Sequence, residues 1–214
     1  FATGASLSVA GALMQVLVRN PLADPYVLGT SGGAAAFALT AMVLGASGAL
    51  VDFSAFAGAL ASTSVVFFLA RSERWDSARL LLTGIVTASA WSAAVSLILA
   101  ASPERNLRGA LFWLMGDFAY VDTGVAPLTV AALGTLATLL RARPLNLLSM
   151  GDAQAALLGL AVRRTRVVVY VLGAALTASA VTTAGTIGFV GLVVPHLVRI
   201  VGGADNRLVL PASA

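Results

Sequence analysis

The chain has 214 residues, of which 59% are hydrophobic and 10% are charged, and its mean hydropathy is +0.95. This composition excludes an ordinary soluble domain and indicates an integral membrane protein. All 13 basic residues are arginines, so there is no lysine for a P-loop and the chain is not itself a standard ATPase. The absence of cysteine excludes disulfides and thiolate ligands, and a single histidine makes a metal site unexpected. No basic motif accompanies the net charge of +4, so nucleic-acid binding is not expected either.

Seven apolar segments follow one another along the chain, and an eighth begins at its end, which predicts an all-α, polytopic membrane protein. The chain starts without methionine inside an apolar stretch, so we expect a fragment of a longer protein. The seven segments cover residues 1–18, 27–46, 53–70, 80–101, 125–140, 167–184 and 187–201.

Arginines between the segments fall unevenly on the two sides, with eleven on one side and only Arg105 and Arg108 on the other. Because arginine near a membrane span marks the cytoplasmic side, the N-terminal end is predicted outside and the last complete crossing ends inside. The outer loop over residues 102–122 has the spacing of a short amphipathic helix. The eleven inner arginines are Arg19, Arg71, Arg74, Arg79, Arg141, Arg143, Arg163, Arg164, Arg166, Arg199 and Arg207.

Small residues recur at four-residue spacing in the apolar segments. Examples are Gly4, Ser8 and Ala12 in the first segment, and Gly29 and Gly33 in the second. Small side chains let membrane helices approach closely, so this spacing predicts tight helix packing.

The longest polar stretch, residues 141–166, lies on the cytosolic side in this orientation. Pro144 is expected to bar a helix behind it, and Ser149 can cap the amides that follow. Asp152 supplies a carboxylate to the first turn, and Gly159 offers a left-handed stop. The signals therefore predict a short helix within the loop.

This predicted helix covers residues 150–158 and is too short to cross a bilayer, which takes roughly 20 apolar residues. Its apolar residues Ala155, Leu157 and Leu158 are expected to form an exposed face that needs a partner. The alternative is a helix that lies flat on lipid headgroups.

If the chain moves a substrate across the membrane, its sequence limits the possible energy sources. All nine carboxylates fall in loops or at the ends of apolar segments, so a titrating group on a transport path is poorly supported. An ion-coupled secondary transporter that holds sodium with backbone carbonyls remains an alternative. Energy delivered by another protein that docks on residues 141–166 is the favoured interpretation.

An enzymatic alternative comes from residues 29–32, which read GTSG and match the G-x-S-G pattern of intramembrane serine proteases. Ser31 would be the nucleophile and His196 its base, and both lie toward the cytoplasmic ends of their segments. Four-residue patterns are weak evidence in a chain rich in glycine and serine.

Three motifs in order carry a resemblance that covers essentially the whole chain. Residues 19–34 read RNPLADPYVLGTSGGA, residues 145–151 read LNLLSMG and are followed by Leu158 and Gly159, and residues 185–199 read GTIGFVGLVVPHLVR. Together they closely resemble the FecCD/vitamin B12-type permease family of type II ABC importers, which take up iron–siderophores, haem or cobalamin.

The resemblance implies a permease bundle with ten helices per subunit. This chain looks like helices two to eight and the start of nine, so the first helix and the last two would be missing. Residues 1–214 would form one transmembrane permease domain, and residues 141–166 would be its cytoplasmic coupling loop.

The resemblance further implies a transport subunit rather than an enzyme, located in the bacterial inner membrane as a multi-pass homodimer. Its expected partners are cytosolic ABC ATPases, which use ATP and Mg, and a periplasmic substrate-binding protein. The chain itself would bind no cofactor or metal. The transported substrate would be an iron–siderophore, haem or a cobalamin-like chelate.

Site residues are carried over from the family's motifs. Prolines 21 and 25 independently predict a compact turn around the first gate residues. Ala78 departs from the family, which often has hydroxyls there. By resemblance, the cytoplasmic gate would be lined by Asn20, Leu22, Ser77 and Ala78. The residues that would couple to the ATPase are Asn146, Leu147, Ser149, Met150, Gly151, Asp152, Ala155, Leu158 and Gly159.

Overall fold

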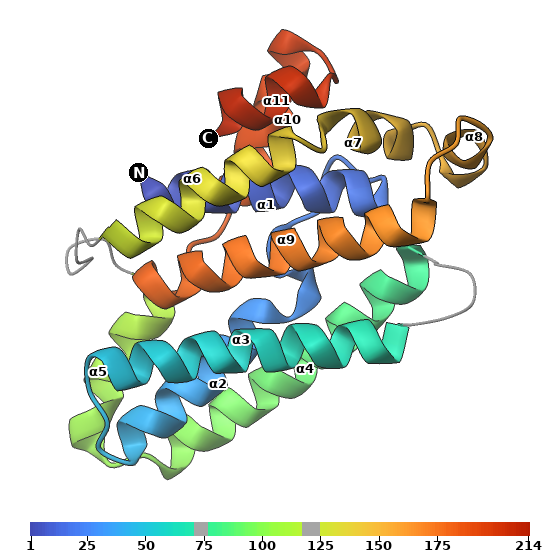
Figure 1. Cartoon of the computed structure of the whole chain (residues 1–214). Helices are drawn as coiled ribbons and strands as arrows, with labels where there is room; N and C mark the ends of the chain where they lie inside the picture. The colour runs from blue at the N-terminus through green and yellow to red at the C-terminus, as the bar shows by residue number, and fades with distance from the viewer. Residues whose placement is uncertain (71–76, 117–124) are drawn as a thin grey trace. The chain divides into compact units, whose positions relative to one another are not determined.

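The computed structural model describes residues 1–70, 77–116 and 125–214, and every regular element within these ranges is helical (Figure 1). The predicted all-α class is therefore confirmed. The chain divides into two compact units, and each is described by itself. The first unit comprises Phe1–Pro25, Val125–Thr177 and Phe189–Ala214, and the second comprises Tyr26–Gly124 and Ala178–Gly188.

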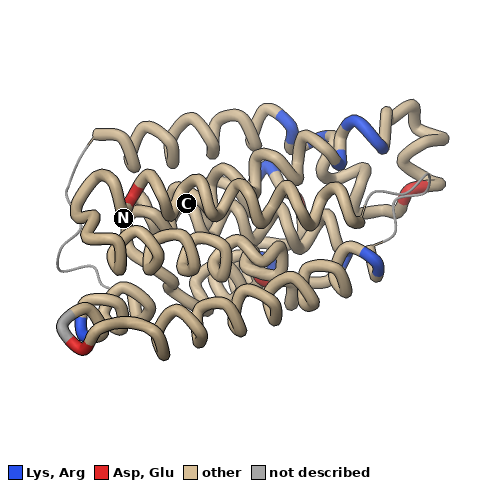
Figure 2. The backbone as a smooth tube through the Cα atoms, turned by 90° about the horizontal axis from the view of Figure 1, so that it is seen from below, with Lys and Arg blue, Asp and Glu red and all other residues tan. Residues whose placement is uncertain are grey.

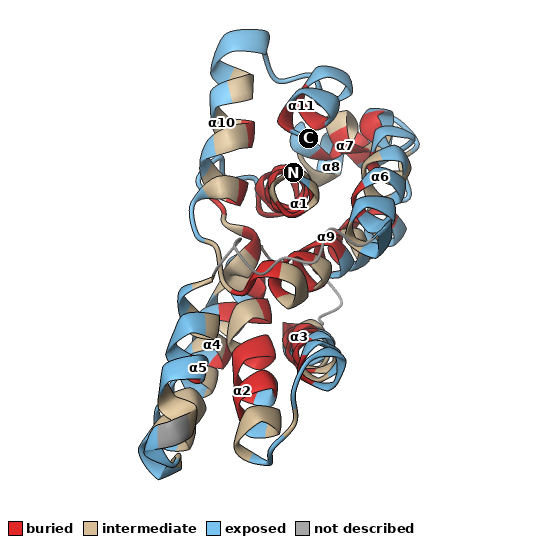
Figure 3. Cartoon of the chain, turned by 90° about the vertical axis from the view of Figure 1, so that its left-hand side faces the viewer, coloured by how far each residue is buried: buried red, intermediate tan, exposed pale blue. Residues whose placement is uncertain are grey.

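The first unit is built around helix α1, whose residues are buried along nearly its whole length (Figure 3). An apolar helix without a polar face is expected to be enclosed by its neighbours. Helices α6, α7, α10 and α11 all pack against it. The helices of this unit are α1 (Ala2–Val18), α6 (Val125–Leu139), α7 (Ala142–Ser149), α8 (Asp152–Leu157), most of α9 (Val162–Ala184), α10 (Val190–Gly202) and α11 (Asn206–Ser213).

Two glycines bring the backbones of α1 and α10 into direct contact. A Cβ atom added to Gly11 would lie 1.7 Å from the carbonyl oxygen of Gly191. Only a residue without a side chain fits such a crossing, as in other tightly packed membrane helices.

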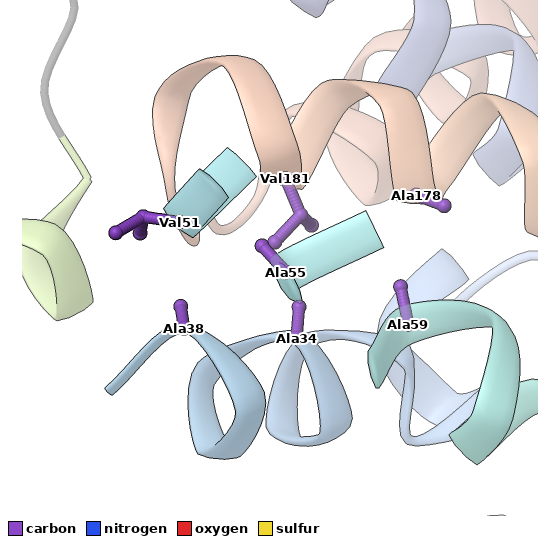
Figure 4. Close-up of a cluster of buried hydrophobic side chains, with 7 residues drawn as sticks. All are labelled: Ala34, Ala38, Val51, Ala55, Ala59, Ala178 and Val181. Carbon is purple, nitrogen blue, oxygen red and sulfur yellow. The ribbon is translucent and has the colours of Figure 1, made fainter. Parts of the chain in front are cut away.

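The second unit has a core of small side chains from α2, α3 and the end of α9 (Figure 4). Gly33 and Gly58 sit at the close contact of α2 with α3, where a Cβ on Gly33 would lie 2.4 Å from the Gly58 oxygen. The packing predicted from Gly33 is thus confirmed. The core residues are Ala34, Ala38, Val51, Ala55, Ala59, Ala178 and Val181. The helices are η1 (Pro25–Leu28), α2 (Thr30–Val43), α3 (Ala49–Ala70), α4 (Ser77–Ala101), α5 (Glu104–Met115) and the last turns of α9.

Three described helices, α3, α4 and α9, are long and apolar enough to cross a membrane. Helices α6 and α7 pass the same test only together, with a bend of 61° between them, and would make a fourth span if counted as one. Helices α1, α2 and α10 are apolar but shorter. Charged residues lie mainly toward helix ends, and long stretches of the helices carry none (Figure 2).

Several predicted boundaries are corrected by the structure. The second apolar segment begins as a 3₁₀ turn, and α2 starts only after Gly29, whose φ of +68° is left-handed. Helix α9 begins at Val162 rather than at residue 167, so Arg163, Arg164 and Arg166 belong to a helix and not to a loop. The helix predicted within residues 102–122 is confirmed as α5.

Candidate functional site

Residues 141–166 contain two short helices, α7 and α8, where the sequence predicted one. Helix α7 begins at Ala142, two residues before Pro144, so the expectation that this proline bars a helix behind it is wrong. Proline is tolerated in a first turn because amide groups there lack an intrahelical acceptor. Leu145 and Leu148 point into the first unit and are buried. Their burial fixes α7 to the unit.

The prediction that Ser149 caps the following helix is also wrong. Because α7 continues through Ser149, its Oγ donates back to the Leu145 oxygen at 3.0 Å. The residue before α8 is instead Gly151, with a φ of +106° and no side-chain cap. Such a backbone conformation is readily available only to glycine.

The end of α8 follows the prediction from Gly159. This glycine has a φ of +81°, and its amide donates to the Ala156 oxygen at 2.9 Å. The Leu160 amide donates to the Ala155 oxygen, also at 2.9 Å. The two bonds form a Schellman motif, so the left-handed stop is confirmed.

The exposed apolar surface of this segment differs from the predicted one. Ala155 is fully buried, so the expectation that it forms an exposed face with Leu157 and Leu158 is wrong for this residue. Leu157 is 88% exposed, Leu158 is 59% exposed and Met150 is 57% exposed. Three large apolar side chains in or next to α8 are therefore left exposed by the described part of the chain.

The side chain of Asp152, the first residue of α8, contacts a residue of the same chain, Arg166. Its Oδ1 atom accepts a hydrogen bond from Nη2 of Arg166 at 2.6 Å, in an ion pair. The Arg166 side chain is 0% exposed and that of Asp152 is 39% exposed. Because its side chain is buried, Arg166 is not a surface arginine of the loop. A buried guanidinium needs a charged or hydrogen-bonding partner, and Asp152 is one such partner.

Asn146 connects α7 to the start of α11. Its Nδ2 donates to Asp205 Oδ1 at 2.7 Å, and its Oδ1 accepts from the amide of Asn206 at 2.9 Å and from Asn206 Nδ2 at 2.7 Å. Both ends of the Asn146 amide are therefore engaged within the first unit.

Comparison of the sequence with models of known protein families identifies the family of this chain. The sequence profile of the FecCD transport family matches residues 1–214. The chain belongs to this family.

Similar proteins are named as permeases of transport systems. The chain is 40% identical over 223 residues to the uncharacterized ABC transporter permease protein YvrB of Bacillus subtilis, covering 99% of this chain and 62% of the relative. It is 41% identical over 221 residues to the hemin transport system permease protein HmuU of Yersinia pestis, covering 99% and 66%. It is 40% identical over 216 residues to the cobalamin import system permease protein BtuC of Halobacterium salinarum, covering 99% and 58%. The chain thus spans less than two thirds of each relative.

The fold agrees with this membership. A solved inward-facing conformation of a metal-chelate type ABC transporter superposes with a TM-score of 0.91 at 31% identity, covering 99% of this chain and 69% of that chain. The helices therefore have the fold of a type II ABC importer permease.

The predicted gate residues of this FecCD chain lie in both units. Asn20 and Leu22 form a turn after α1 in the first unit, where Asn20 Oδ1 accepts from the Leu22 amide at 2.9 Å. The predicted compact turn is confirmed, and Leu22 is exposed. Ser77 and Ala78 begin α4 in the second unit. Their joint role as a gate stays a prediction.

Sequence reasoning missed a polar contact inside the first unit. Gln15 is buried in α1, and its Nε2 donates to the Leu192 oxygen of α10 at 3.1 Å. Its Oε1 accepts from Nη1 of Arg199, whose Nη2 also donates to the Ala12 oxygen at 3.4 Å. Polar side chains of membrane helices are expected to bond across helices. The signal was the single carboxamide within residues 1–18.

The protease alternative gains no support from the structure. Ser31 lies in α2 of the second unit and His196 in α10 of the first, so neither unit contains both side chains. Membership in the FecCD family favours transport instead.

Asp205 offers a pH-dependent contact at the edge of the candidate site. Its Oδ1 accepts from the Arg207 amide at 2.9 Å and from Asn146. The bond from the Arg207 backbone, followed by that from Asn146, lowers the pKa of the Asp205 carboxyl. A lowered folded-state pKa stabilises the fold above the unfolded pKa of about 4 and loses that contribution as pH falls through the folded pKa.

We therefore expect α11 to open more readily as the pH falls below about 4, because the opened form then takes up a proton on Asp205 at a higher pH than the folded form does. Amide hydrogen exchange of the full-length protein, corrected for intrinsic rates, measures this opening. The control is Asp205→Asn, which keeps a capping side chain but removes the titration. Equal pH profiles for the two proteins would contradict the role given to the carboxylate.

Proposed function

We propose that this chain is the membrane-spanning part of a permease subunit in an ABC importer, and that it moves a metal chelate, haem or cobalamin across the bacterial inner membrane. The observation that carries the proposal is the match of the whole chain to the FecCD family, together with the TM-score of 0.91 to an inward-facing transporter. The substrate class rests on the hemin and cobalamin names of the relatives.

The proposed topology has seven crossings and the start of an eighth. Helices α3, α4 and α9 meet the length requirement, α6 with α7 supplies a bent span, and α1, α2 and α10 supply shorter ones. Short spans are acceptable where the surrounding protein, rather than lipid, covers the helix ends. Helix α1 fits this condition, since its neighbours in the first unit enclose it.

The proposed energy source is a cytosolic ATPase that docks on residues 141–166. Met150, Leu157 and Leu158 provide the exposed apolar surface for this contact. Helix α8 has six residues, so it cannot contribute a span of its own. A second permease copy and a periplasmic substrate-binding protein complete the proposed assembly, as the resemblance implies.

An ion-coupled carrier is less consistent with the described residues. None of the buried side chains among residues 1–70, 77–116 and 125–214 is an aspartate or glutamate. Carriers of that class usually place such groups on the transport path. An external ATPase explains the same chain without them.

Uptake by reconstituted vesicles tests the proposal. The full-length permease, its ATPase and its binding protein are placed in proteoliposomes with haem or cobalamin as the probe. We expect uptake only with ATP and Mg, and none with a sodium or proton gradient alone. Gradient-driven uptake without ATP would favour the secondary carrier and contradict the ABC assignment.

A further inference from the structure

The ion pair between Asp152 and Arg166 joins a short helix to a long apolar one. Asp152 begins α8, a six-residue helix, whereas Arg166 is the fifth residue of α9, which is long and apolar enough to cross a membrane. Arg166 Nη2 and Asp152 Oδ1 are 2.6 Å apart. The bond therefore connects the candidate docking helix directly to a span.

Helix α8 is set off from its neighbours by glycine turns at both ends. Gly151 before it has a φ of +106° and Gly159 after it has a φ of +81°. Within α8, Ala155 is buried and Asp152 forms the ion pair with Arg166. Rotation of α8 about these turns would stretch or break the pair unless α9 moved as well.

The burial of Arg166 makes such a separation costly. Its side chain is 0% exposed, so a broken pair would leave a charged guanidinium out of water without this carboxylate. A displacement of α8 is therefore expected to be followed by the start of α9. Such a chain of packed and charged contacts is the physical means by which motion passes between sites.

We propose that the Asp152–Arg166 pair is a positioning link that transmits the movement of α8 to α9. The proposal rests on the ATPase docking proposed above. It also changes the role that the resemblance implies for Asp152, from a residue that contacts the ATPase to one that acts through Arg166. Leu157 and Leu158 remain the contact surface.

A neutral double replacement separates a mechanical link from a stabilising contact. Asp152→Asn alone leaves Arg166 buried beside a neutral group and should lower the thermal stability of the full-length permease. Adding Arg166→Met removes the buried charge, and neutral replacement of both members of a buried pair is often tolerated. Arg207→Met, at an exposed arginine of α11, is the control for loss of an arginine.

The readout is substrate transported per ATP hydrolysed in the reconstituted complex, measured beside the melting temperature and the affinity for the ATPase. We expect the double variant to melt close to the wild type but to transport at least fivefold less substrate per ATP, since couplings between sites are typically worth roughly 5–150-fold. The Arg207→Met variant should match the wild type in all three measurements.

Three results would overturn the link. One is a double variant that transports as much substrate per ATP as the wild type, which would make the pair only structural. Another is loss of ATPase binding in Asp152→Asn without a change in melting temperature, which would make Asp152 a contact residue. A wild-type complex that hydrolyses ATP without moving substrate would overturn the proposed function and the link with it.

Discussion

Replacement of Gly11 by alanine is expected to destabilise the full-length permease severely. The added Cβ would lie 1.7 Å from the Gly191 oxygen, so α1 and α10 would have to separate. One turn further along α1, the bonds of Gln15 to Leu192 and Arg199 would weaken with them. Overpacking costs about 1–3 kcal/mol and occasionally more, so with these bonds we expect a loss of roughly 3 kcal/mol.

Thermal unfolding of the purified full-length protein measures this effect. A loss of roughly 3 kcal/mol corresponds to a melting temperature lower by about 6–12 °C for a domain of this size. Gly4→Ala in the same helix is the matched control, because no described atom lies within 4 Å of its added Cβ. Alanine there should leave stability unchanged or raise it slightly. A Gly11→Ala variant that melts with the wild type would refute the proposed backbone contact.

The contrast between Gly4 and Gly11 shows how far the spacing of small residues could be read. The pattern of Gly4, Ser8 and Ala12 correctly predicted a tightly packed helix, but the closest approach falls on Gly11, which lies outside that pattern. Which face meets a neighbour depends on α10, more than 170 residues later in the chain. Spacing within one segment carries no information on that partner.

Arginine positions were informative in the same limited way. They predicted the orientation of the segments from a general rule on charge near a span, and this stays a prediction. They also predicted a loop at Arg163, Arg164 and Arg166, which is wrong because these residues lie in α9. They could not show that Arg166 is buried, since its burial depends on Asp152, which only the turn at Gly151 brings within reach. A charged residue was read as solvated because its partner could not be identified from spacing.

Local backbone signals were reliable at Gly159 and in the turn after α1, but not at Pro144, which lies within α7. Gly159 ends α8 as predicted, and the turn after α1 forms at the predicted prolines. Ser149 failed because a serine can cap the next helix or bond back within its own. The choice was decided by α7, whose leucines pack into the first unit and extend the helix through Ser149. Tertiary packing therefore overrode the local signal.

Glutamate at both Leu157 and Leu158 is expected to abolish productive docking of the ATPase. The two leucines are 88% and 59% exposed, so the change should not disturb the folded permease. Burying a leucine contributes about 1.5–3 kcal/mol, and the new carboxylates would add a desolvation cost. We expect a loss of roughly 3 kcal/mol in binding, or about 150-fold in affinity.

The affinity of the full-length permease for its ATPase, measured in detergent or nanodiscs, checks this result, and ATP-driven uptake should fall with it. Leu44→Glu is the control, because Leu44 is 81% exposed but lies on the opposite side of the membrane in the predicted orientation. It replaces an exposed leucine by the same charged residue, with one added charge rather than two, and should leave the affinity unchanged. Unchanged affinity in the Leu157 and Leu158 variant would instead favour contact of α8 with lipid headgroups, because an interfacial helix needs its apolar side chains for the membrane and not for a protein.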